Sequence, residues 1–124
     1  MKTNFLGLKT TIYHVPNLSE AKEWYTKVFS TDPYFENDFY IGFNVMGYEL
    51  GLYLDKTSSD KKSDNIESLW GVSNVEKEHK RMIELGATEH SAPQNVGGDI
   101  IVSNLKDPWG NVIGLICNPH FKLP

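Results

Sequence analysis

Two carboxylates and a histidine are the side chains of this chain that could carry chemistry. Glu49 alternates with leucines along residues 48–54, so it is expected on the strand face opposite those leucines. A carboxylate pair for acid–base chemistry would have to be Glu49 and Glu67. His14 is the best single group that titrates near neutral pH, and a histidine satisfied at a strand end is the alternative interpretation.

No other motif in the sequence predicts a reaction. The four histidines form no H-x-x-x-H or H-x-H pair, and His79 stands among charged residues of a predicted helix, where we expect it on the solvated surface. The chain has no glycine-rich phosphate loop and no G-x-S-x-G elbow. Cys117, the only cysteine, lies in an apolar run and is expected in the core.

Two aromatic residues could stack on a flat ligand. Tyr53 shares the predicted strand face of Glu49, and Trp109 lies in a predicted turn. For these two residues, packing in the core is an equal alternative. Trp24 and Tyr25 lie on the apolar face of a predicted helix, so we expect both of them in the core.

The elements that must position these residues occur twice along the chain, as a sequence repeat. Residues 11–29 and 68–86 share a short apolar run, a Val-x-Asn corner and a polar stretch with helical spacing. A repeat of this length indicates a duplicated supersecondary unit. We expect the functional site in a cleft between the two copies.

Each copy predicts one strand, one helix and then further strands. Asn17 and Asn74 are expected to cap the two helices, which end near Phe29 and at Gly86. The Met46-Gly47 pair predicts a hairpin turn, and Asp107-Pro-Trp-Gly110 predicts a β-turn. The predicted strands span 8–15, 39–45, 48–54, 87–90, 100–105 and 111–117.

The composition indicates one globular domain of 124 residues. A net charge of −4 argues against a nucleic-acid partner, and no apolar run approaches the roughly 20 residues of a membrane span. The single cysteine and the lack of a signal-peptide centre lead us to expect a cytoplasmic protein. Residues 56–64 are rich in Ser, Asp and Lys and are expected to be a solvated linker between copies at 6–55 and 65–121.

These features resemble the vicinal oxygen chelate superfamily, which includes glyoxalase I, bleomycin- and fosfomycin-resistance proteins and extradiol dioxygenases. The resemblance rests on two βαβββ copies, on the corner His14-Val-Pro-Asn-Leu18 and on Asp107-Pro-Trp-Gly-Asn111 before the last apolar strand. It covers about residues 6–121. It implies an α+β fold in which the two curved mixed sheets face a shared cleft with the helices outside, and it implies a two-fold homodimer.

The resemblance further implies four metal-ligand positions, on the first and last strands of each copy. In this chain they are Thr10, Gly51, Glu67 and Gly114. Only Glu67 offers a good ligand, so we expect no metal and no cofactor, with a Glu49–Glu67 metal site as the alternative. Because relatives carry carboxylates at the two glycine positions, we expect the glycines to leave room for a ligand and the backbone to tolerate Gly114→Glu.

The residues expected to line the cleft share one alternating face of the strands: Thr10, Ile12, His14, Glu49, Gly51, Tyr53, Glu67, Leu69, Gly71, Val112, Gly114 and Ile116, with Trp109 at the mouth. A mostly apolar pocket with a few polar groups is typical of a small-molecule site. We therefore expect a metal-free protein that holds an aromatic or amphipathic ligand, as bleomycin-resistance proteins do by sequestration. The alternatives are a metal-dependent glyoxalase I-like lyase or isomerase, a dioxygenase, or a purely structural interaction module.

Overall fold

The computed structural model describes residues 2–4, 6–56, 62 and 66–121 of the chain. The chain divides into two compact units, residues 1–59 and 60–124, called unit one and unit two below. Most of the expected linker, residues 56–64, lies outside the described residues.

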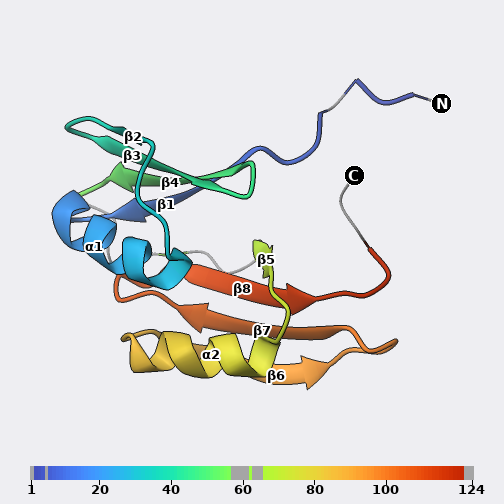
Figure 1. The fold of residues 1–124 in the computed structure, drawn as a ribbon. Helices are drawn as coiled ribbons and strands as arrows, with labels where there is room; N and C mark the ends of the chain where they lie inside the picture. Colours follow the sequence, from blue (N-terminus) through green and yellow to red (C-terminus); the bar gives the residue numbers. More distant parts are fainter. Residues whose placement is uncertain (1, 5, 57–61, 63–65, 122–124) are drawn as a thin grey trace. The chain divides into compact units, whose positions relative to one another are not determined.

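Unit one is a four-stranded mixed sheet with one helix. Its elements in chain order are β1 (Thr10–Val15), α1 (Leu18–Phe29), β2 (Phe35–Glu36), β3 (Tyr40–Val45) and β4 (Tyr48–Leu54). The strand order across the sheet is β1-β4-β3-β2, with β1 parallel to β4 and the other pairs antiparallel (Figure 1).

Unit two repeats this arrangement. Its elements in chain order are β5 (Leu69–Gly71), α2 (Val75–Glu84), β6 (Thr88–Asn95), β7 (Ile101–Lys106) and β8 (Val112–Cys117). The strand order is β5-β8-β7-β6, again with a parallel first pair. The shared topology confirms the predicted duplication and the α+β class, with one mixed sheet in each βαβββ copy.

Both helices begin at the predicted asparagine caps. The side chain of Asn17 accepts a hydrogen bond from the Glu20 amide at 3.0 Å, and Asn74 accepts one from the Lys77 amide at the same distance. Each cap satisfies a backbone N–H that the first helical turn leaves without a partner. The second helix is followed by Gly86 with a φ of 111°, a backbone conformation that favours glycine.

The hairpin between β3 and β4 turns at Met46 and Gly47, as predicted. Both residues have positive φ, 53° and 93°, which is the geometry of a type I′ turn. The two-residue turn sets the register, so Val45 pairs with Tyr48 and Gly42 pairs with Gly51.

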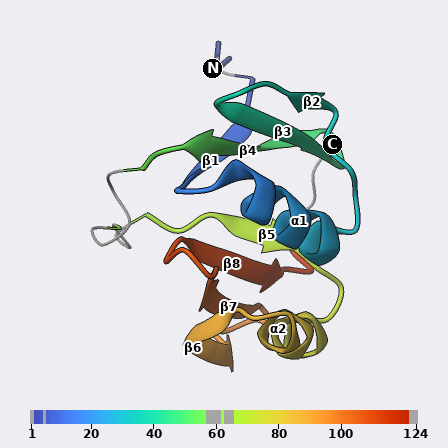
Figure 2. The ribbon, with the colours of Figure 1, turned by 90° about the vertical axis from the view of Figure 1, so that its left-hand side faces the viewer.

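One face of each sheet packs against its own helix (Figure 2). In unit one, α1 buries Ala21, Tyr25 and Val28 against residues that alternate along the strands, and Tyr25 stacks on Tyr13 with ring centroids 5.8 Å apart. The buried strand residues of unit one are Tyr13, Val15, Ile41, Phe43, Leu50 and Leu52. The prediction that Tyr25 lies in the core is therefore confirmed, whereas Trp24 and Cys117 are only half-buried.

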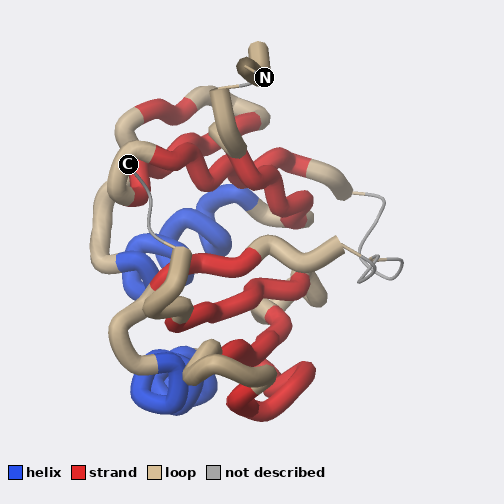
Figure 3. Tube along the Cα trace, turned by 90° about the vertical axis from the view of Figure 1, so that its right-hand side faces the viewer, coloured by secondary structure: helices blue, strands red, loops and turns tan. Residues whose placement is uncertain are grey.

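Unit two packs its helix α2 against its sheet in the same way (Figure 3). Val75, His79 and Met82 face the sheet, where Leu105, Ile113 and Leu115 are buried. None of the helices in the described part of the chain is long and apolar enough to span a bilayer.

The short strand β2 was not predicted, and β6 is longer than the predicted strand at 87–90. Both are edge strands, which are exposed over most of their length. Edge strands bury few apolar side chains, so they carry little of the alternating pattern from which a strand is predicted.

Candidate ligand-binding site

The sheet of unit one has a face that its helix does not cover, called the open face below. It carries the residues of β1 and β4 that alternate with the core, and the register places Thr10 beside Glu49, Ile12 beside Gly51 and His14 beside Tyr53. Ile12 and Tyr53 are 52% and 41% exposed. The sequence therefore correctly predicted that these side chains share a face. The residues of the open face are Thr10, Ile12, His14, Phe35, Tyr40, Gly42, Glu49, Gly51 and Tyr53.

The carboxylate of Glu49 is the polar centre of the open face. Thr10 donates a hydrogen bond from its Oγ1 to Glu49 Oε1 at 3.0 Å, and the hydroxyl of Tyr34 donates to Oε2. Tyr40 is a third hydroxyl partner of this carboxylate. Glu49 is thus held by three neutral hydroxyl groups, which come from β1, from the loop before β2 and from β3.

These contacts shift the proton affinities of the groups involved. The pKa of Glu49 lies below its usual value of 4.5, first because Tyr34 donates to it and further because Thr10 and Tyr40 do, while burial acts in the opposite direction. Burial, together with the neighbouring Glu49 carboxylate, raises the pKa of Tyr40 to about 12. The hydrogen bond to Glu49 likewise raises the pKa of Tyr34. At neutral pH Glu49 is therefore ionised and both tyrosines are protonated.

The expectation that Gly51 leaves room for a ligand is wrong. A Cβ atom at Gly51 would overlap the hydroxyl of Tyr40, and the ring carbon Cζ of Tyr40 would lie only 2.7 Å away. The glycine is needed because Tyr40 packs across it from β3. The space that a carboxylate would fill at this position is thus occupied by a phenol.

His14 and Tyr53 lie together at the other end of the open face. The Nδ1 atom of His14 is 2.8 Å from Oδ2 of Asp55, and the rings of His14 and Tyr53 have centroids 5.1 Å apart. His14 is therefore engaged with a carboxylate at the end of its strand, as the alternative interpretation of this histidine anticipated.

Unit two places a different polar group on the corresponding face of its sheet. Asn104 Nδ2 donates to Glu67 Oε1 at 2.7 Å and to Ser91 Oγ at 3.2 Å. Asn104 is 8% exposed, and its Oδ1 is buried without a hydrogen-bond partner among the described residues. Because the amide nitrogen must face the Glu67 carboxylate, the acceptor oxygen is forced to point the other way.

Gly114 is also closely surrounded, so the expected space there is absent. A Cβ atom at this position would overlap Cδ2 of Leu69, and it would lie 2.7 Å from the backbone oxygen of Ser68 and 2.9 Å from Oδ1 of Asn104. The expectation that the backbone tolerates Gly114→Glu is therefore wrong. Trp109 lies half-buried in its turn, where its backbone N–H donates to Oδ1 of Asp107 at 2.9 Å.

The structure brings five of the predicted site residues together in unit one and leaves three in unit two. The first group is Thr10, His14, Glu49, Gly51 and Tyr53, and the second is Glu67, Trp109 and Gly114. A cleft shared by both groups stays a prediction.

The residues at the four positions implied by the family do not fit a divalent metal. Thr10 is committed to Glu49, Tyr40 covers Gly51, and Glu67 is bound to Asn104. No group of three or more His, Cys, Asp or Glu side chains in the described ranges 2–4, 6–56, 62 and 66–121 could hold a metal ion. Hard divalent metals require several oxygen ligands, so these positions cannot supply a family-type centre.

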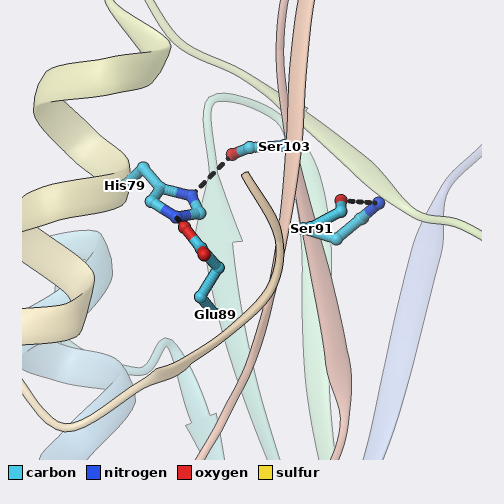
Figure 4. Close-up of polar contacts among 5 residues, drawn as sticks. His79, Glu89, Ser91 and Ser103 are labelled. Atoms are coloured by element: carbon cyan, nitrogen blue, oxygen red, sulfur yellow. Dashed lines mark hydrogen bonds and ion pairs between the residues drawn. The ribbon is translucent and has the colours of Figure 1, made fainter. Parts of the chain in front are cut away.

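His79 lies in the core of unit two, so the expectation of a solvated surface position is wrong. It is 4% exposed, with Nδ1 2.9 Å from Ser103 Oγ and Nε2 2.8 Å from Glu89 Oε1 (Figure 4). The spacing Val75, His79, Met82 puts it on the buried helix face despite its charged neighbours. The arrangement resembles a serine–histidine–acid relay, but Ser103 is fully buried and no substrate could reach it.

Sequence reasoning missed Tyr34 and Tyr40 as partners of Glu49, and Asn104 as a partner of Glu67. A signal for Tyr40 was present, because a two-residue turn at Met46-Gly47 pairs Tyr40 with Tyr53 and so places it on the open face. The position of Asn104 on the corresponding face of unit two follows in the same way from its pairing with Gly114. Tyr34 precedes the two-residue strand β2, and nothing in its local sequence predicts its contact.

The sequence model of the Glyoxalase/Bleomycin resistance protein/Dioxygenase superfamily matches residues 7–115, and the chain belongs to this superfamily. A comparison with curated protein sequences gives no match. Solved structures with the same fold include a glyoxalase-related enzyme from Fulvimarina pelagi, which has a TM-score of 0.77, 15% identity, and coverage of 97% of this chain and 94% of that one.

Two further structural relatives have named activities. Lactoylglutathione lyase from Agrobacterium tumefaciens has a TM-score of 0.73 and 15% identity, with 94% of this chain and 98% of that chain covered. A fosfomycin resistance protein from Listeria monocytogenes has a TM-score of 0.74 and 13% identity, with 96% and 97% covered. At these identities the structural similarity establishes the fold. The match of the superfamily's sequence model to residues 7–115 confirms the resemblance to the vicinal oxygen chelate superfamily.

The lowered pKa of Glu49 predicts a loss of stability in acid. The unfolded chain binds this proton more readily, so the stabilisation is present above the unfolded pKa and is lost as the pH falls through the lower folded pKa. We expect the free energy of unfolding, measured with urea between about pH 3 and pH 7, to fall less steeply in Glu49→Gln than in the native protein. An identical pH dependence in both proteins would contradict this prediction.

Proposed function

We propose that this chain binds an aromatic or amphipathic small molecule on the open face of unit one and that it does so without a metal. The observation that carries the proposal is the composition of this face: exposed apolar and aromatic side chains surround a single half-buried carboxylate. Ile12, Phe35 and Tyr53 are 52%, 45% and 41% exposed, although they belong to regular strands of the sheet. Small-molecule sites are usually lined by apolar side chains with a few fixed polar groups.

The metal-dependent alternative has less support in this chain. Lyases are found among proteins with this fold, as the name of the Agrobacterium tumefaciens relative records. In this chain, however, a phenol covers the position of Gly51, and Glu49 is already bound by three hydroxyls. The site therefore has a better geometry for holding an organic molecule than for holding a cation with open coordination positions.

The expected small-molecule partner, the two-fold homodimer and the cytoplasmic location remain predictions. A second copy of this chain could cover the open face, since exposed apolar sheet surfaces are often buried in two-fold assemblies. Metal analysis of the purified protein, together with native mass spectrometry for co-purified small molecules, tests the central proposal. One bound transition metal per chain on Glu67 or Glu49 would overturn it.

The proposal predicts that Tyr53 contributes to ligand affinity. With 2-naphthylmethanol as a neutral aromatic probe, Tyr53→Ala is expected to weaken binding by about 1 kcal/mol, or roughly five-fold, because a stacking surface is removed. Met46→Ala is the control, since Met46 is a large side chain of unit one that lies at the hairpin turn and is 94% exposed. Equal affinities of the two variants in calorimetric titrations would show that the probe binds elsewhere.

A further inference from the structure

We propose that the open face is selective for positively charged ligands, with Glu49 as the group that binds an ammonium or a planar aromatic cation. This inference rests on the proposed binding function and specifies its ligand class. The structural basis is a carboxylate whose partners are all neutral, set among aromatic rings.

The charge of Glu49 has no counter-ion in the described part of the chain. Its side-chain partners are the hydroxyls of Thr10, Tyr34 and Tyr40, and none of the ion pairs of the described residues includes it. Two other carboxylates of unit one do have a counter-ion: Glu36 lies 2.9 Å from the amine of Lys22, and Glu23 lies 3.4 Å from that of Lys27. Glu49 therefore presents an uncompensated negative charge on the face.

The partial burial of Glu49 strengthens the attraction between its carboxylate and a cationic ligand. The residue is half-buried rather than exposed, and a charge at the edge of a protein interior is screened less than one in bulk water. A cation that reaches Glu49 would thus gain more than it would from an exposed carboxylate, whereas an anion would be repelled.

Aromatic rings close to the carboxylate favour the same ligand class. Phe35 lies between Tyr34 and Tyr40, with ring centroids 6.4 Å from each, and the ring of Tyr34 also approaches Gly42 beside Glu49. The faces of such rings attract ammonium and aromatic cations. An apolar body on the same ligand would contact Ile12 and Tyr53, which are exposed on this face.

Glu49 also has acceptor capacity to spare. A carboxylate accepts about four hydrogen bonds, and the three hydroxyl groups leave one position for an N–H donor. The three hydroxyls fix the orientation of the carboxylate before a ligand arrives, so little side-chain entropy would be lost on binding. The carboxylate is accordingly a preorganised acceptor for a single cationic group.

The test compares three probes that share a naphthalene ring and differ in charge. They are 2-naphthylmethylammonium, 2-naphthylmethanol and 2-naphthylmethanesulfonate, each titrated into the native protein by calorimetry. We expect the cationic probe to bind on the order of ten-fold more tightly than the neutral probe, and the anionic probe to bind most weakly. Amide resonances of Gly42 and Gly51, which lie beside Glu49 on the open face, are expected to shift on binding.

Glu49→Gln and Glu36→Gln form the matched pair of variants. Both remove one negative charge from unit one, but Glu36 belongs to an ion pair with Lys22 of α1, away from the open face. We expect Glu49→Gln to abolish the preference for the cation while changing the neutral probe less than about two-fold, and Glu36→Gln to keep the preference. Thermal melts establish whether both variants are folded. If Glu49→Gln does not fold, the affinities of the native protein for the three probes test the charge selectivity.

The outcomes separate the two proposals. If none of the three probes binds, the proposed binding function fails and the charge selectivity fails with it. If the probes bind with equal affinity or the anion binds best, the charge selectivity is overturned and the binding function stands. If Glu49→Gln retains the preference for the cation, the assignment of that preference to Glu49 is overturned.

Discussion

Replacing Gly114 with glutamate is expected to lower the free energy of unfolding of unit two by about 3 kcal/mol or more. The added Cβ would lie 2.7 Å from the backbone oxygen of Ser68, and it would overlap the side chain of Leu69. Leu69 can rotate, but the backbone oxygen accepts a hydrogen bond from the Gly114 amide at 2.9 Å and is held by the pairing of β5 with β8. The strand pairing would have to open to admit the side chain. Urea unfolding followed through amide signals of β7 and β8 measures the effect.

A pair of alanine variants isolates this steric cause. Gly114→Ala adds only the Cβ and is expected to destabilise unit two by roughly 1–3 kcal/mol. Gly71→Ala is the matched control, because Gly71 lies in the neighbouring strand β5 and an added Cβ there meets nothing within 4 Å. We expect Gly71→Ala to be neutral or slightly stabilising. Equal free energies of unfolding in the two variants would show that Leu69 and Ser68 move aside without any loss of stability.

Removing the buried imidazole in His79→Ala is expected to cost unit two about 3 kcal/mol. Two effects add: the loss of packed volume beneath α2, and a Ser103 hydroxyl that is left buried without its partner at 2.9 Å. Lys80→Ala is the control, since Lys80 is the next residue of the same helix and is exposed. That change is expected to alter stability by less than about 0.5 kcal/mol.

A double-mutant cycle separates the two contributions at His79. In a Ser103→Ala background the hydroxyl is already absent, so the additional cost of His79→Ala should fall by about 1 kcal/mol or more. A loss of less than about 1 kcal/mol in the single His79→Ala variant would contradict a structural role for this histidine.

The sequence alone determined the repeat, the helices and the faces of the strands. These features depend on local chemistry: Asn17 and Asn74 cap helices through their own side chains, and the Met46-Gly47 turn defines the register of β3 and β4. Alternation along β1 and β4 then assigned Thr10 and Glu49 to one face. The caps, the turn and the alternation each need only residues that are close together in the chain.

The tertiary structure alone decided what the side chains of the site contact. Glu49 meets Tyr34 and Tyr40 because the sheet pairs β2 with β3 and β3 with β4. This pairing brings the two phenols over Gly42 of β3 and Gly51 of β4, which leave no side chain in their way. Whether the space beside a glycine is empty or occupied depends on residues that strand pairing brings from elsewhere in the chain.

His79 illustrates the same division within one helix. Its charged neighbours in sequence predicted a surface position, whereas its helical spacing with Val75 and Met82 placed it against the sheet. A buried histidine is tolerated there only because Ser103 and Glu89, from two strands that follow the helix, supply a partner for each ring nitrogen. Local pattern thus specified which elements form and which faces they present, while hydrogen-bond partners and close contacts were settled by strands that meet only in the folded sheet.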